Sequence, residues 1–177
     1  METFDRKKQC EMHKNMFDRT NYAIENGFYL EAVFMEYAAI EGRLEVMLGI
    51  LGAPCNRLLP DIERRKFNIS QRVKCVKRAF NNDKDIFEFS KLNNRYFNKL
   101  ENWLIKRNQY IHGLYKNEVE YEVRVSNREF AEKGLDLCRL LYNEVNRLKR
   151  LQKKSPDLFN NLSVCNNNCS ISNSQNT

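Results

Sequence analysis

Apolar residues recur every three or four positions along most of the chain, which is the pattern of amphipathic α-helices. The strongest such segment runs from Phe28 to Leu51, and Gly52-Ala53-Pro54 ends it. Its apolar positions are Leu30, Val33/Phe34, Tyr37, Ile40, Leu44, Met47/Leu48 and Leu51. Residues 5–24 predict a charged helix before it, and Gly27 ends that helix as glycine commonly does.

Three further helices follow from the same periodicity and from residues that favour helix ends. Ser70 is a suitable N-cap for a helix over 71–80. A long helix is predicted over 84–112, and Gly113 is expected to break or kink it. The last helix is predicted to end near Lys154, where Ser and Pro follow.

Two segments depart from the helical pattern. Residues 115–125 alternate apolar and charged side chains with a period of two, which predicts a short extended arm or hairpin edge. The chain after the last helix is rich in Asn and Ser, which favours disorder. We therefore predict an all-α protein: an antiparallel bundle of four to five helices with a short extended arm between the last two. One domain spans 1–154, and a disordered tail spans 155–177.

Charge and hydropathy indicate which partners and which compartment to expect. The net charge of +7 favours polyanionic partners such as RNA, DNA or acidic membranes. The longest apolar region, residues 29–51, is interrupted by glutamates and an arginine, and no stretch has the roughly 18–20 apolar residues that would span a bilayer. No secretory signal is visible at the N-terminus. We expect a cytoplasmic protein with no membrane partner.

No motif for a metal or a cofactor is visible. The six cysteines are expected to be reduced, and Cys75 and Cys138 fall on apolar helix positions as core thiols. Cys165 and Cys169 have the spacing of a metal pair, but no second Cys/His pair accompanies them. Glycine-rich phosphate loops, G-x-S-x-G and H-E-x-x-H are all absent from the sequence. We expect neither a cofactor nor a metal.

The segment from Arg107 to His112 is the strongest candidate for chemistry. An arginine can bind a phosphate with a forked geometry, and a histidine can exchange protons near neutral pH. On a straight helix the two lie about 140° apart around the axis, whereas Asn108 and His112 share a face. The pair can therefore meet through the length of the arginine, through a kink near Gly113, or across a dimer. The alternative is a surface arginine and a helix-end histidine that are close by chance.

The motif Arg107-Asn108-x-x-x-His112 resembles the R-(N/polar)-x(4–6)-H signature of HEPN domains. Members of that family are helical bundles, often dimeric, and include toxins, abortive-infection proteins and the RNA-cleaving effectors of some CRISPR systems. The resemblance covers roughly 27–154 in helix order and is specific only at the motif. One branch of the family has an antitoxin-modified Tyr two residues after the His, whereas Tyr115 is three residues after His112.

The resemblance implies a metal-independent endoribonuclease, namely a toxin or an antiphage-defence effector. The ribose 2′-OH would attack the adjacent phosphate, with His112 as general base or acid, Arg107 holding the phosphate and Asn108 orienting the histidine or the RNA. Flanking residues implied to bind RNA are Lys106, Tyr115 and Lys116. The implied partners are RNA, a second copy of the chain that completes a composite active site, and an antitoxin or activator.

Two other functions stay open at this point. The chain could be a non-catalytic HEPN-like module that binds RNA, a nucleotide or a protein partner, or a structural helical protein with an incidental Arg-His pair. Glu36 and Glu41 could approach Arg107 and orient it, but acidic residues beside core positions more often form the polar edge of a helix. They are not included in the catalytic set.

Overall fold

The computed structural model describes residues 6–51, 68–82, 84–88, 90–115 and 128–160 of the 177. The helices are α1 (Arg6–Glu25), α2 (Tyr29–Ile50), α4 (Ile69–Asn82), α5 (Lys84–Phe87), α6 (Asn94–Tyr115), α8 (Arg128–Lys154) and α9 (Asp157–Asn160). Within these ranges no residue is in a strand. The predicted all-α helical bundle is confirmed, with five long helices in the described part of the chain.

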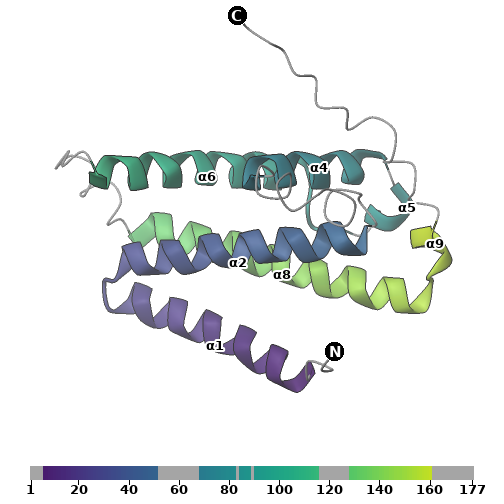
Figure 1. The fold of residues 1–177 in the computed structure, drawn as a ribbon, viewed down its shortest axis with the longest axis horizontal. Coiled ribbons are helices and arrows are strands. Elements are labelled where there is room, and N and C mark those ends of the chain that lie inside the picture. The colour runs from purple at the N-terminus through teal and green to yellow at the C-terminus, as the bar shows by residue number, and fades with distance from the viewer. Residues whose placement is uncertain (1–5, 52–67, 83, 89, 116–127, 161–177) are drawn as a thin grey trace, which may run out of the picture.

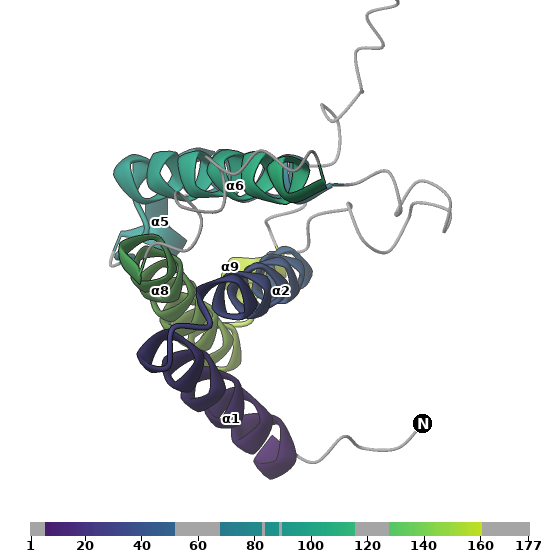
Figure 2. The ribbon, with the colours of Figure 1, turned by 90° about the vertical axis from the view of Figure 1, so that its left-hand side faces the viewer.

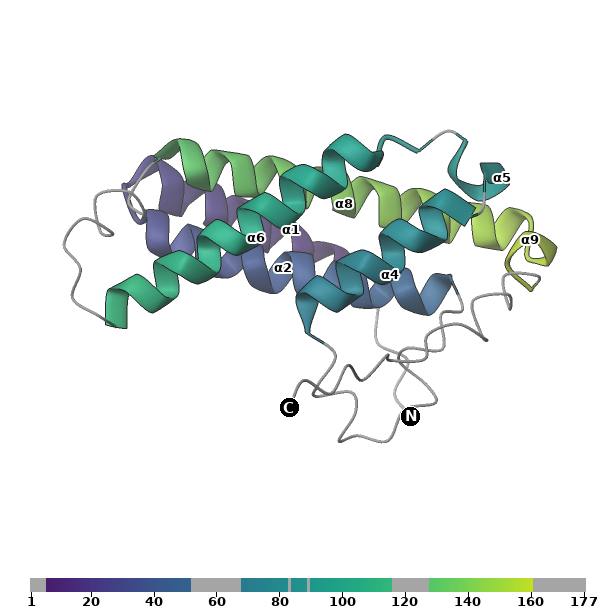
Figure 3. The same ribbon diagram turned by 90° about the horizontal axis from the view of Figure 1, so that it is seen from above.

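The helices form three layers (Figures 1 and 2). The pair α4 and α6 lies on one side, α2 and α8 lie in the middle, and α1 covers the opposite side. The central helix α2 packs against α1, α4 and α8. Seen from above, α4 and α6 form the layer nearest the viewer (Figure 3). The two functional candidates Arg107 and His112 therefore belong to an outer layer of the bundle.

Burial on several sides explains the composition of α2. A helix covered by neighbours around most of its circumference has little room for a polar face. Its buried apolar side chains are Ala32, Val33, Ile40, Leu44, Met47, Leu48 and Ile50. The helix α8 shows the opposite pattern, since its exposed face carries oppositely charged neighbours such as Arg128 and Glu132, 2.8 Å apart. The hydrophobic core joins these two helices to α4 and α6 on one side and to α1 on the other.

The start of α4 differs from the prediction that Ser70 is its N-cap. The Asn68 side-chain oxygen accepts a hydrogen bond from the Gln71 N–H at 3.0 Å, and the Gln71 side-chain oxygen accepts one from the Asn68 N–H at 2.9 Å. This reciprocal pair is a capping box, which satisfies two backbone donors at once. Asn68 thus caps the helix, and Ser70 lies inside its first turn.

The prediction of one helix over 84–112 is wrong, because this segment forms two helices, α5 and α6. The chain leaves the helix after Phe87 and re-enters it at Asn94. Ser90 Oγ accepts a hydrogen bond from the Leu92 N–H at 3.0 Å, and Asn93 Oδ1 accepts one from the Tyr96 N–H at 2.9 Å. Such side chains offer the backbone partners that compete with a continuous helix.

The C-terminal end of α6 lies beyond the predicted residue 112. Gly113 is buried and lies within α6, which continues to Tyr115. The glycine therefore does not end the helix, since its burial among neighbouring elements outweighs its weak helical propensity.

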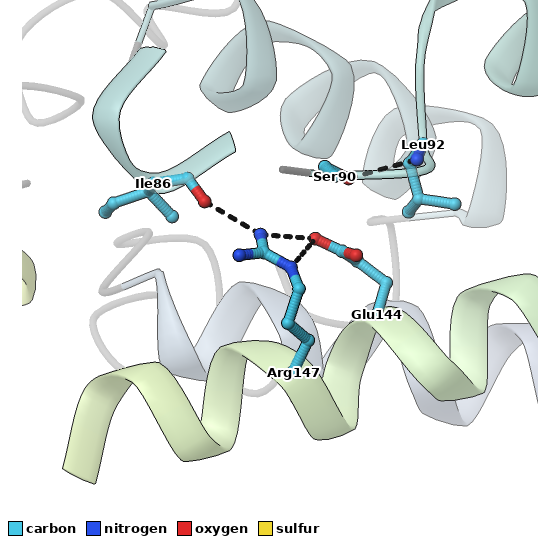
Figure 4. A network of polar contacts seen from close by, with 5 residues as sticks. All are labelled: Ile86, Ser90, Leu92, Glu144 and Arg147. Atoms are coloured by element: carbon cyan, nitrogen blue, oxygen red, sulfur yellow. Dashed lines mark hydrogen bonds and ion pairs between the residues drawn. The ribbon is translucent and has the colours of Figure 1, made fainter. Parts of the chain in front are cut away.

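A polar network joins α5 to α8 (Figure 4). Arg147 donates to the Glu144 carboxylate at 2.7 Å and to the Ile86 carbonyl oxygen at 2.7 Å. Glu144 is only 4% exposed, so the arginine neutralises a buried charge while it holds α5 in place. This contact therefore ties α5 to α8.

Part of the predicted tail is ordered structure. Residues 157–160 form α9, and Phe159 is buried in the core. The predicted extended arm falls largely on residues 116–127, and the rest of the predicted tail is 161–177. Both ranges lie outside the described residues.

At Gly134 of α8, side chains from both α2 and α6 lie against the α8 backbone. A Cβ at this position would meet the carboxylate of Glu36 from α2 and would lie 2.7 Å from Trp103 Cζ2 of α6. Both distances are shorter than real Cβ contacts allow. The three helices can reach this separation because residue 134 has no side chain.

Replacing Gly134 with alanine should therefore destabilise the protein, although alanine normally favours a helix. We expect Gly134→Ala to lower the free energy of unfolding by about 1–3 kcal/mol through overpacking. Gly42→Ala is the matched control, because a Cβ there meets nothing within 4 Å, and it should gain up to about 1 kcal/mol. Urea denaturation of both variants checks the prediction, and a Gly134→Ala protein as stable as Gly42→Ala would contradict it.

Candidate functional site

Arg107 and His112 lie on the same helix but differ in their surroundings. Arg107 is half-buried, whereas His112 is exposed. Because α6 is continuous from Asn94 to Tyr115, the two side chains leave the axis about 140° apart. No hydrogen bond or ion pair joins them among the described residues. A single chain in this conformation does not bring the predicted pair together.

Arg107 is held by aromatic rings from α2. Its guanidinium carbon lies 3.8 Å from the centre of the Tyr37 ring and 5.4 Å from that of Phe34. Its Nε is buried and has no hydrogen-bond partner in the described part of the chain. Cation–π attraction favours this position, since each ring presents a negative face to the cation. The packing of α2 beside α6 therefore sets where Arg107 points.

Asn108 is hydrogen-bonded to Arg107 and lies on the same face of α6 as His112. Arg107 Nη1 donates to Asn108 Oδ1 at 3.2 Å. Asn108 is exposed and, four residues before His112, shares its side of the helix. Asn108 is therefore on the side of the helix from which it could orient His112, as predicted. Its described hydrogen bond, however, is with Arg107.

The predicted RNA-binding residues lie at two places. Lys106 is exposed on α6, immediately before Arg107. Tyr115 is the last residue of α6, and Lys116 lies outside the described residues. Among described residues, no group of three or more His, Cys, Asp or Glu side chains is placed to hold a metal ion.

Glu36 is the side chain whose burial the sequence analysis missed. It is 1% exposed, and neither carboxyl oxygen has a hydrogen-bond partner among the described residues. Burial raises its pKa from 4.5 to about 9, so the group is protonated and neutral near pH 7. Its spacing from Val33 and Ile40 is the signal that could have shown this, because it places Glu36 within the apolar stripe rather than at its edge.

Glu36 and Glu41, the two glutamates that could approach Arg107, have different surroundings. Glu36 borders Gly134 together with Trp103, which is one turn before Arg107 on α6. Glu41 instead pairs with Arg72 of α4 at 3.7 Å. Of the two, only Glu36 lies in the part of the core that also positions Arg107.

Cys75 and Cys138 were both predicted to be core thiols, and Cys138 is the one that is fully buried. Cys138 is buried and donates to the Glu36 carbonyl oxygen at 3.4 Å. Burial raises the pKa of this thiol, and the nearby Glu36 raises it further. Cys75 is half-buried.

A shallow groove of about 790 Å³ lies between α1 and α2, lined by residues that include Tyr22, Phe28 and Met35. Neither Arg107 nor His112 is among the side chains that line it. Among the described helices, none combines the length and the apolar composition that a membrane span requires.

The buried Glu36 predicts a distinct pH dependence of stability. A folded-state pKa near 9, raised from 4.5, means that the folded protein holds this proton more tightly than the unfolded chain. The stabilisation is fully present below pH 4.5 and is lost as pH rises towards 9, with a slope of at most about 1.4 kcal/mol per pH unit. Glu36→Gln should remove this slope, whereas Glu31→Gln, an exposed change on the same helix, should keep it. Urea denaturation across this pH range measures both slopes. An unchanged slope in Glu36→Gln would refute the assignment.

Comparison with known proteins gives this chain no relative. No protein-family model, no curated protein and no solved structure matches it. The arrangement of its own side chains is therefore the basis on which function can be inferred.

Proposed function

We propose that the protein is a metal-independent endoribonuclease of HEPN type, a toxin or antiphage-defence effector, that acts as a homodimer. The observation that carries the proposal is the contrast within one helix: Arg107 is fixed against the Tyr37 ring, while His112 is open to solvent. A phosphodiester cleavage without metal requires a fixed cation for the phosphate and an accessible group for proton transfer.

The fixed arginine supports this proposal because it is preorganised. A guanidinium already held by two rings loses less freedom when it binds a phosphate than a mobile surface arginine would. Its hydrogen bond to Asn108 holds one edge of the fork at the exposed side of the helix. Charge developing on the phosphate oxygens would then meet a donor that needs little reorganisation.

The proposed reaction uses the RNA's own 2′-OH. One imidazole accepts the 2′-OH proton as the oxygen attacks the adjacent phosphorus. The bond from phosphorus to the 5′-oxygen breaks, and that oxygen takes up a proton from an imidazolium or from water. The products are a 2′,3′-cyclic phosphate and a 5′-hydroxyl. DNA lacks the attacking group and would bind without being cleaved.

The separation of Arg107 and His112 around α6 supports a composite site. Since the helix is continuous, a second copy related by a two-fold axis could supply the histidine that one copy cannot direct towards its own arginine. Each dimer would then have two equivalent sites. An antitoxin or activator that controls this assembly is part of the proposal.

A second candidate function is the non-catalytic module that binds RNA, a nucleotide or a protein partner. The observation in its favour is that Arg107 already has aromatic and amide partners and makes no contact with His112 in the described chain. A binding module would need the arginine but not the histidine, so the two candidates differ in what the loss of His112 does.

Incubating purified protein with RNA in EDTA tests the enzymatic proposal. We expect cleavage to fall about 10²–10³-fold in Arg107→Ala and about 10²–10⁴-fold in His112→Ala. Arg150→Ala, an exposed arginine of α8, and His13→Ala, the other histidine, are the matched controls and should cleave normally. Cleavage that survives either site substitution rules out this mechanism, and RNA binding that needs Arg107 without any cleavage favours the module.

Mixing the two inactive variants tests the composite site. After subunit exchange, an Arg107→Ala subunit paired with a His112→Ala subunit has one complete site out of two. Because half of the dimers are mixed, we expect about a quarter of the wild-type cleavage rate to return. If each subunit carries its own complete site, the mixture stays inactive.

A further inference from the structure

The solvent-facing side of α6 carries a stripe of cations. Arg95, Lys99 and Lys106 are all exposed. Their spacing places them within about 40° of one another around the axis, over about 16 Å of its length. They therefore form one continuous basic edge rather than three scattered charges.

Amide side chains form a second stripe directly beside this edge. Asn98, Asn102 and Gln109 are exposed, and they lie at intervals of four and seven residues on the outward side of α6. The same stripe reaches His112 one turn further on. The outer face of α6 thus combines phosphate-binding cations with hydrogen-bonding amides and leads towards the candidate histidine.

Acidic residues do not compensate this face. Glu101 is the only acidic residue of α6, and α4 beside it has none. Glu101 is already neutralised by Lys77 of α4, whose ammonium lies 3.6 Å from it. Arg95 and Lys99 have no ion pair with any described acidic residue. Lys106, at the far end of the stripe, lies near the start of α8 and helps Lys133 lower the pKa of Glu129.

The exposed charges in the first half of α8 show a different arrangement. Lys133 pairs with Glu129 at 2.6 Å, and Arg139 pairs with Asp136 at 3.7 Å. Cations and anions alternate there at helical spacing, so their fields largely cancel over a Debye length. On α4 and α6, by contrast, several cations face the single acidic residue Glu101, in the layer seen from above in Figure 3.

We propose that the outward face of α6 is the track along which a single RNA strand reaches the candidate site, with Arg95 and Lys99 binding its phosphates. The proposal rests on the ribonuclease function inferred for Arg107 and His112, and it names a substrate-binding surface remote from them. Arginine and lysine supply the charge contacts, and the neighbouring amides of Asn98 and Asn102 can donate and accept hydrogen bonds with sugars and bases.

The chemistry of this face favours RNA over an acidic membrane surface. A helix that lies in a membrane interface needs a broad apolar side for insertion. On the outward face of α6, Ile105 is the one large hydrophobic side chain that is exposed among the described residues, at 55%. Amides on both sides of it prefer hydrogen-bonding partners to lipid.

Binding to a fluorescent single-stranded oligoribonucleotide and to its 2′-deoxy counterpart tests the track. We expect the double variant Arg95→Gln/Lys99→Gln to bind both probes about tenfold more weakly at moderate salt. The slope of log affinity against log salt should decrease in magnitude by about 1.4, because two phosphate contacts of a single strand are lost. Both residues are exposed, so circular dichroism should show an unchanged fold.

Lys153→Gln/Lys154→Gln is the matched control, since it removes the same charge from exposed positions at the end of α8. Unchanged binding in this control supports the track. An equal loss in both double variants would overturn it, because net charge alone would then explain binding. Binding of the wild type to phosphatidylserine vesicles that depends on Arg95 and Lys99, with RNA binding unaffected, would also overturn it.

The 2′-deoxy probe separates this inference from the proposed function. It binds without a reactive 2′-OH, so its affinity does not depend on catalysis. Weaker binding of the Arg95→Gln/Lys99→Gln variant in a protein that never cleaves RNA would support the track and reject the ribonuclease. Normal cleavage and normal binding by the same variant would reject the track alone.

Discussion

The close approach of α2, α6 and α8 at Gly134 is the constraint on which the arrangement of the candidate site depends. Only glycine fits at a position where Glu36 and Trp103 both lie against the α8 backbone. Trp103 is fixed further by its indole N–H, which donates to the Phe130 carbonyl oxygen at 3.2 Å, and by the Phe130 ring stacked on it. These contacts hold α6 against the middle layer at Trp103.

The position of Arg107 follows from this packing. Trp103 and Arg107 are four residues apart on the same side of α6, so the contact that buries the indole also directs the guanidinium towards α2. There Tyr37 and Phe34 receive it. His112 leaves the same rigid helix on the solvent side, and no adjustment of Gly113 brings it round, because that glycine is buried within an unbroken helix. The core therefore determines both the fixed arginine and its separation from the histidine.

Sequence periodicity predicted the all-α class and the positions of α1, α2 and α8 because their apolar spacing is long and regular. It failed between Phe87 and Asn94, where the hydrogen bonds of Ser90 and Asn93 interrupt the apolar pattern without altering it. The candidate motif was visible in the sequence, but the rings that hold Arg107 come from a helix about seventy residues earlier in the chain. Contacts of that range depend on the tertiary packing, which periodicity along one helix does not contain.

The described partners of Arg107 are aromatic faces and an uncharged amide. An anion beside it would be a strong partner and would offset its charge. Glu36, the residue before Tyr37 on α2, is itself neutral near pH 7, because desolvation raises its pKa to about 9. The full positive charge of Arg107 is left for an anion from outside the chain, and a phosphate arriving along the basic face of α6 would be such an anion.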